Sequence, residues 1–252
     1  MPYAHSKGGY AYNLKGGFYM KYSLPKAPAT NPAEPNFRFY SDNAQSNSSN
    51  SQIFMCGSFD YPAMQRLDEA INATIPYYLF DIPSRQDGYR CTENQLDSLD
   101  LRTRNNVQLT FFYQGSGGQE SLFHKLHTHD GNHFRNLALQ SWRTDQTSDF
   151  SVINVKLHEK NGQQLKSTTD HSKWLLEYVV VRSSNTSVPD PEGFCVGDLN
   201  NKHSQFERGG SLMCMYNAVV NKLFRCGVVE MDLSGIDPAA QEIIKNSVKY
   251  DC

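Results

Sequence analysis

The sequence lacks the short motifs that identify many enzymes. It contains no GxxxxGK[ST] phosphate-binding loop, no GxSxG nucleophile elbow and no CxxC pair among its six cysteines. No stretch approaches the ~18 apolar residues that a membrane-spanning helix needs, and the first residues lack the apolar segment of a signal peptide. We therefore expect reduced thiols in a protein that is made and kept in the cytosol without membrane contact.

The chain also lacks a strong net charge. Its 24 basic and 26 acidic side chains give a formal charge of -2, which argues against an all-over basic surface and makes nucleic acid an unlikely partner. A length of 252 residues with 38% hydrophobic content is enough for one sizeable core. We expect a single body rather than several domains.

Aromatic residues and lysines are instead concentrated at the start of the chain. The stretch KGGYAYNLKGGFYMKY (7–22) is followed by four prolines spaced through 25–35, which disfavour helix and favour an extended tether. We therefore divide the chain into an N-terminal arm and tether (1–36) and a single sandwich-like body (37–252). Rings seek burial, and so short a segment cannot form its own core, which leaves the body or a neighbouring copy as its partner. Self-association through the arm is the leading hypothesis, with these contact residues: Tyr3, Tyr10, Tyr12, Phe18, Tyr19 and Tyr22.

The remaining sequence predicts many strands and few helices. Residues 60–73 are expected to form an amphipathic helix, with Asp60 as N-cap and an apolar stripe that includes Leu67. A second helix is expected to start at Ser211, run past Cys214 and Cys226 and end at Gly227. A third is expected to start at Asp237-Pro238. Strands are expected at 37–41, 52–57, 77–82, 107–113, 150–157, 173–181 and 228–233. Strands without regular βαβ alternation favour an α+β class with antiparallel pairing.

Two features leave alternative functions open. His124, His127, His129 and His133 lie within the stretch HKLHTHDGNH, so a cytosolic metal-dependent enzyme could use this cluster. The glutamate of a zinc peptidase is missing there, and Asp-Gly-Asn favours a polar loop. Lysines interleaved with aromatic rings (Lys7, Lys15 and Lys21) are also what an RNA-binding segment would need. We assign no catalytic and no metal-ligating residue.

Two stretches resemble a known family. FRFYSDN (37–43) is followed by a polar loop, a strand and a helix, and residues 193–238 place Val-Gly before a polar loop, a helix ending at Cys-Gly and an acidic strand. In order and spacing this is similar to the polyhedrins of cypoviruses. The resemblance implies an antiparallel β-sandwich flanked by helices, with an extended N-terminal arm that clasps neighbours. It also implies trimers that pack into a cubic lattice.

The same resemblance implies a structural protein and not an enzyme. Such a protein embeds and protects virions in crystalline occlusion bodies in the host cell cytoplasm, and its partners are further copies of itself and virion surface proteins. No cofactor is required, although a nucleotide trapped in the lattice is possible, with no residue assigned to it. The 14 tyrosines fit a lattice that dissolves at alkaline pH, because phenols ionise near pH ~10.

Overall fold

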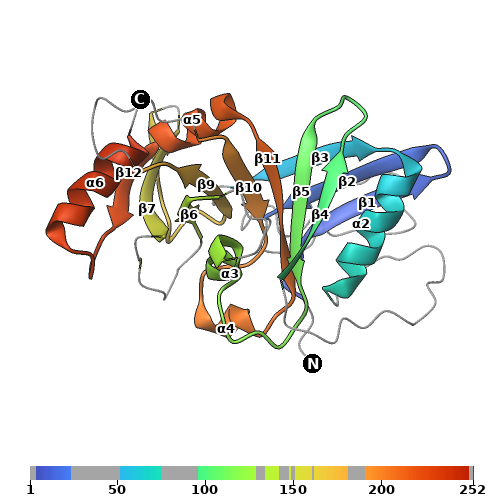
Figure 1. Ribbon diagram of the computed structural model, residues 1–252, viewed down its shortest axis with the longest axis horizontal. Helices are drawn as coiled ribbons and strands as arrows, with labels where there is room; N and C mark the ends of the chain where they lie inside the picture. The colour runs from blue at the N-terminus through green and yellow to red at the C-terminus, as the bar shows by residue number, and fades with distance from the viewer. Residues whose placement is uncertain are drawn as a thin grey trace.

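Two β-sheets form the framework of the computed structural model, which describes residues 4–23, 52–74, 96–128, 134–141, 148, 151–160, 162–180, 191–249 and 252. A three-stranded antiparallel sheet has the order β1 (Gly8–Asn13), β2 (Gly16–Tyr22) and β3 (Phe54–Phe59). The larger sheet has the order β12-β7-β6-β9-β10-β11-β5-β4, with β8 paired to β7 (Figure 1). Its strands are β4 (Leu96–Arg102), β5 (Gln108–Gln114), β6 (Asn136–Gln140), β7 (Val152–Lys160), β8 (Gln163–Lys166), β9 (Trp174–Tyr178), β10 (Gly193–Gly197), β11 (Gly210–Tyr216) and β12 (Val228–Asp232).

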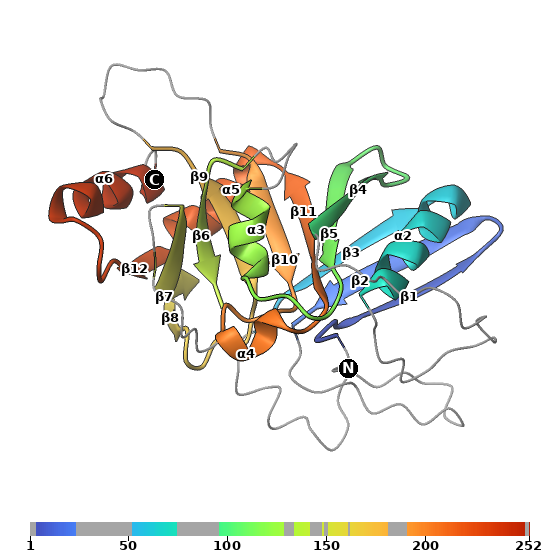
Figure 2. The ribbon, with the colours of Figure 1, turned by 60° about the horizontal axis from the view of Figure 1, so that its bottom comes forward.

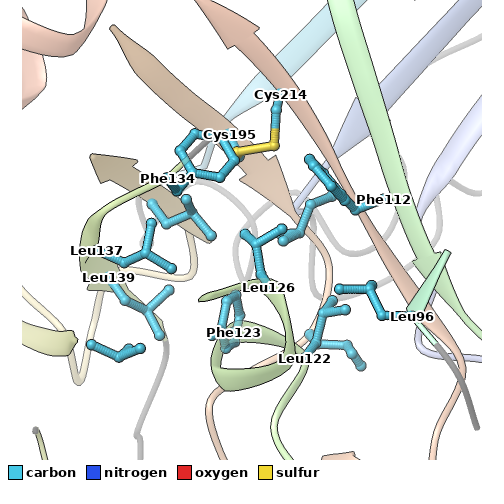
Figure 3. Close-up of a cluster of buried hydrophobic side chains, with 14 residues drawn as sticks. Leu96, Phe112, Leu122, Phe123, Leu126, Phe134, Leu137, Leu139, Cys195 and Cys214 are labelled. Atoms are coloured by element: carbon cyan, nitrogen blue, oxygen red, sulfur yellow. A yellow bond between two sulfur atoms is a disulfide. The ribbon is translucent and has the colours of Figure 1, made fainter. Parts of the chain in front are cut away.

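Helices cover both faces of the larger sheet (Figures 1 and 2). On one face, α3 (Leu122–Thr128) inserts apolar side chains that pack against β6, β9, β10 and β11. Figure 3 shows the α3 side chains gathered with Leu137 and Leu139, below the Cys195–Cys214 disulfide in that view. On the other face, α5 (Ala218–Cys226) and α6 (Pro238–Val248) pack against the core around Trp174. None of the helices in the described part of the chain has the length and apolar character needed to cross a bilayer.

The helix predicted at 60–73 is confirmed as α2 (Tyr61–Ala73). The Asp60 side chain accepts a hydrogen bond of 2.9 Å from the backbone N–H of Ala63, so the predicted N-cap is present. The predicted stripe is the buried face, and it packs against β2, β4 and β5 together with Tyr19 and Phe111. The strands expected at 52–57, 107–113, 150–157, 173–181 and 228–233 correspond to β3, β5, β7, β9 and β12, and the terminal helix to α6.

The helix expected to start at Ser211 is wrong. Residues Gly210–Tyr216 form β11, and the helix begins only at Ala218, where the Asn217 side chain accepts from the backbone N–H of Val220. β11 lies inside the larger sheet between β10 and β5, so it is buried on both faces. A strand buried on both faces has a continuous apolar run instead of alternation, and such a run resembles one buried stripe of a helix.

The expectation of reduced cysteines is also wrong for four of the six. Cys195 on β10 and Cys214 on β11 are directly paired in the strand register and form a disulfide. A second disulfide joins Cys226 at the end of α5 to Cys252. Cys56 is an exposed free thiol, and Cys91 lies outside the described residues. Disulfides persist in oxidising compartments, so the cysteines no longer favour the cytosol.

The α+β class is confirmed, whereas the sandwich and the extended arm are not. Residues 8–22 form the β1–β2 hairpin, which pairs with β3 and contacts α2. The prolines of the expected tether and the strands expected at 37–41 and 77–82 lie outside the described residues. The division at residue 36 stays a prediction.

Candidate active site

The triplet His-Ser-Lys occurs twice in the chain, at residues 5–7 and 171–173. Each copy stands directly before a strand, because β1 begins at Gly8 and β9 begins at Trp174. Residues two apart in extended backbone point to the same side, so this spacing can present an imidazole and an ammonium group together. In the first copy Lys7 Nζ lies 2.9 Å from His5 Nε2. In the second, Lys173 Nζ donates to the backbone carbonyl of His171 at 2.7 Å.

The fold brings the two triplets to one place, where the two sheets meet. β2 contacts β10, and Figure 1 shows the three-stranded sheet passing behind β11 and β5. The backbone N–H of His5 donates to the carbonyl of Gly209 at 2.9 Å, and the N–H of Gly197 donates to the carbonyl of Lys173 at 2.9 Å. The charge of Lys173 acts on both His5 and Lys7. The site therefore combines two segments that are far apart in the sequence.

A buried ion pair lies at the centre of this junction. Lys21, on β2, donates to the carboxylate of Asp198, the first residue after β10, and to the hydroxyl of Ser211 on β11. Both charged side chains are fully buried. The Asp198 carboxylate also accepts from the backbone N–H of Ser211 at 3.0 Å and from its hydroxyl at 3.2 Å. A Cβ on Gly210 would lie 2.9 Å from Asp198 Oδ1, so the close approach requires glycine there.

His5 is held in one orientation by its two ring nitrogens. Nδ1 lies 2.6 Å from the backbone carbonyl oxygen of Asp198. A carbonyl can only accept, so the proton of the neutral ring is assigned to Nδ1. Nε2 then carries the lone pair and accepts from Lys7. This tautomer directs a nucleophilic or basic nitrogen toward the lysine cluster.

The cluster carries more positive than negative charge. Burial, and then the charge of Lys7, lower the pKa of His5 from 6.5 to about 3. Burial, and then the charge of Lys173, lower the pKa of Lys7 from 10.5 to about 7. Burial also lowers the pKa of Lys173 to about 8, although Asp198 and Asp170 oppose the change. Neighbouring buried cations with too little counter-charge are what an anion such as phosphate stabilises.

The six aromatic residues predicted for self-association occupy mixed positions. The hydroxyls of Tyr10 and Tyr12 donate to the two carboxylate oxygens of Asp68, at 2.6 and 2.8 Å. Tyr19 and Tyr22 are buried, with Tyr19 packed edge-on against Phe111 at 5.8 Å. Phe18 is 43% exposed, and Tyr3 lies outside the described residues. These contacts lie within one chain, and contact with a second copy stays a prediction.

The structure describes two of the four histidines in the cluster at 124–133. His124 and His127 lie on α3, where a polar loop was expected, and His129 and His133 lie outside the described residues. The buried Nδ1 of His127 has no hydrogen-bond partner in the described part of the chain. Over the same residues, no three His, Cys, Asp or Glu side chains come close enough together to hold a metal ion. Neither histidine belongs to the triplets.

Sequence reasoning selected Lys7 and Lys21 for an RNA-binding arm and missed their partners. The exact repeat of His-Ser-Lys was the available signal, since each copy precedes a strand. Asp198 and Ser211 carried no such signal, because they meet Lys21 only through strand order in the fold.

Comparisons with known proteins identify a family for this chain. The family model described as deoxyribonuclease II matches residues 1–232. The chain is 27% identical to Plancitoxin-1 of Acanthaster planci, over 90% of this chain and 65% of that protein. It is 24% identical to Cell-death-related nuclease 7 of Caenorhabditis elegans, over 90% of this chain and 63% of that protein. It is 23% identical to Deoxyribonuclease-2-beta of Mus musculus, over 88% of this chain and 64% of that protein. The chain thus spans less than two thirds of the length of these relatives.

These matches contradict the resemblance to cypovirus polyhedrins and the functions drawn from it. The structural role in occlusion bodies, the alkaline dissolution, the virion partners and the location in the host cytoplasm are wrong. The alternatives, a metal-dependent enzyme using His124–His133 and an RNA-binding arm, do not match either. The expectations of a non-enzyme and of no nucleic-acid partner are wrong because the matched family is one of nucleases. With its two triplets inside the matched residues, the chain belongs to the deoxyribonuclease II family.

Proposed function

We propose that this chain hydrolyses phosphodiester bonds of DNA at the junction of the two His-Ser-Lys triplets. The observation that carries the proposal is the excess of positive charge at Lys7 and Lys173 beside a neutral, oriented His5. A phosphodiester supplies the missing negative charge and an electrophilic phosphorus. The family description, deoxyribonuclease II, and the name of the mouse relative support DNA as the substrate.

A two-step reaction that uses one histidine of each triplet completes the proposal. Lys7 and Lys173 bind the non-bridging phosphate oxygens, and the lone pair on His5 Nε2 attacks phosphorus. A P–N bond forms while the P–O bond to the leaving group breaks, and the leaving oxygen takes a proton from the protonated His171. Water then attacks the phosphoimidazole, giving its proton to the neutral His171, and the P–N bond breaks to restore His5. The lysines stabilise the charge that develops on the oxygens in both steps.

Other properties extend this proposal. The disulfides Cys195–Cys214 and Cys226–Cys252 support folding in an oxidising compartment. The reaction above uses only side chains of this chain, and the absence of a required cofactor stays a prediction. The nucleotide expected in a lattice is no longer supported, because it depended on the resemblance to polyhedrins. A sandwich-like stacking of the two sheets likewise stays a prediction.

Cleavage of double-stranded DNA by His5→Asn tests the proposal. We expect its rate to fall by roughly 10³-fold, as for loss of a nucleophile or of acid–base catalysis. His203→Asn, on the exposed surface of α4 (His203–Phe206), is the matched control and should cleave DNA like the wild type. Inorganic phosphate should raise the melting temperature of the wild type and have little effect on Lys7→Met. A wild-type chain that neither cleaves DNA nor binds phosphate contradicts the proposal.

A further inference from the structure

We propose that Lys21 is a positioning residue for this reaction: its buried ion pair with Asp198 holds the backbone carbonyl that orients His5. The inference rests on the proposed function for its effect on catalysis. Its effect on the His5 ring can be measured independently. No contact with substrate is required of Lys21, because it acts through Asp198.

Lys21 connects the two sheets at the point where the triplets meet. It lies on β2, in the same hairpin that follows the first triplet, whereas both of its acceptors belong to the larger sheet. Its side chain is fully buried, and its ammonium group lies 5.8 Å from the centroid of the Phe111 ring on β5. A buried ammonium group is retained at such a cost only where its partners are fixed. The acceptors therefore define the position of β2 relative to β10.

Asp198 transmits this position to His5. Its carboxylate is fixed by Lys21 on one oxygen and by the backbone N–H of Ser211 on the other. Its backbone carbonyl is the acceptor for Nδ1 of His5, at 2.6 Å. The carboxylate contacts tie Asp198 to β2 and β11, so loss of Lys21 would remove one of the contacts that hold this residue, and with it the carbonyl, in place. Loss of that acceptor would free the ring to rotate and to exchange its tautomer.

Lys21 also offsets the negative charge of Asp198. The charged groups that act on Lys7 are Lys173, Asp198, Lys21 and Arg208, and those that act on His5 are Lys7, Asp198 and Lys173. Without the positive charge of Lys21, the negative charge of the Asp198 carboxylate would stabilise the protonated forms of His5 and Lys7 more strongly. Both groups would then hold their protons to higher pH. A protonated His5 cannot attack phosphorus, so Lys21, by offsetting Asp198, supports the neutral ring that burial and the charge of Lys7 already favour.

Lys21→Met tests the inference, with Lys15→Met on the exposed turn of the same hairpin as control. The first measurement is the nitrogen NMR titration of the His5 ring. We expect the wild type and Lys15→Met to show one tautomer protonated at Nδ1. Lys21→Met should show exchange between tautomers and a His5 titration moved to higher pH. If Lys21→Met does not fold, Lys21→Gln carries the test, because it keeps a donor and removes the charge.

The second measurement is hydrolysis of bis(p-nitrophenyl) phosphate across pH. We expect kcat to fall by roughly 10- to 100-fold while KM changes by less than about threefold, since the lysines that bind phosphate remain. The rising limb of the pH profile should move to higher pH. If Lys21 were only structural, less protein would fold but the folded fraction would keep the wild-type kcat and His5 titration, and the inference would be wrong. A wild type without hydrolysis overturns the proposed function, while the NMR titration still decides the role of Lys21.

Discussion

Replacing Lys173 by methionine is expected to stabilise the fold while it removes activity. Lys173 is only 3% exposed, and burial lowers its pKa from 10.5 to about 8. At about pH 6 the side chain is charged in both the folded and the unfolded state, so the folded protein bears the full cost of the buried charge. The difference between the two pKa values corresponds to about 3 kcal/mol. Methionine also loses the hydrogen bond to the His171 carbonyl, about 1 kcal/mol, which leaves a net gain of about 2 kcal/mol.

The sign of the effect changes with pH. The folded pKa of Lys173 lies below its unfolded value, so the unfolded state binds more protons between the two values. Wild-type stability therefore rises between pH of about 8 and 10.5, and the advantage of Lys173→Met should disappear across this window. Urea unfolding with the disulfides intact, at about pH 6 and again above the window, measures both values.

One result would refute this reasoning. If Lys173→Met is less stable than the wild type at about pH 6, the charge of Lys173 is already compensated in the folded protein. The cluster would then have no excess charge for a phosphate to offset, and the argument for an anion site would lose its basis. Unchanged DNA cleavage by Lys173→Met would remove its proposed role in binding phosphate.

Two further predictions concern stability. The double variant Cys195→Ala/Cys214→Ala should lose about 3 kcal/mol of unfolding free energy in urea, because the disulfide closes a loop with a sequence separation of 19; an unchanged midpoint would contradict this. The pKa of Tyr12 is raised from 10.0 to about 12 by burial and by its hydrogen bond to Asp68, so its contribution to stability is present below pH 10 and lost as the pH rises to about 12. Tyr12→Phe should therefore make the unfolding free energy less dependent on pH in that range, whereas a curve parallel to the wild type would rule out this assignment.

Local signals predicted the elements that depend on neighbours in the sequence. α2 was found with its N-cap and its buried stripe, because Asp60 and the apolar spacing act within a few residues. β11 was mistaken for a helix because its burial on both faces is decided by tertiary neighbours, including β5, which lies far away in the chain. Tyr19 and Tyr22 are buried as expected for the rings of residues 7–22, whereas Phe18 is 43% exposed, and the sequence had favoured contact with another copy over contact with the body. The structure places Tyr19 against Phe111 of the same chain.

The site could be predicted only in part, because its groups meet through sheet topology. His5 and Asp198 are 193 residues apart, and Lys21 and Ser211 are 190 apart. A motif search restricted to short stretches favoured the dense histidines of 124–133 and overlooked two sparse triplets. The repeat of His-Ser-Lys before a strand was visible, but nothing in the sequence gave the third partner. The partner that holds the His5 ring is the backbone carbonyl of Asp198, and any residue type could supply such a carbonyl.

The charges of the site also set the pH range of the proposed reaction. In that proposal, attack by His5 requires a neutral ring, and the lowered pKa of His5 provides this above about pH 3. Binding of phosphate requires protonated lysines, and in the unliganded site Lys7 holds its proton only below about pH 7. A bound phosphate would favour the protonated forms of Lys7 and Lys173, so we expect substrate binding above pH 7 to take up protons and to weaken as the pH rises. A neutral His5 and protonated lysines therefore coexist on the acid side of neutrality. Both pKa changes have one main cause, the burial of basic groups where the two sheets meet.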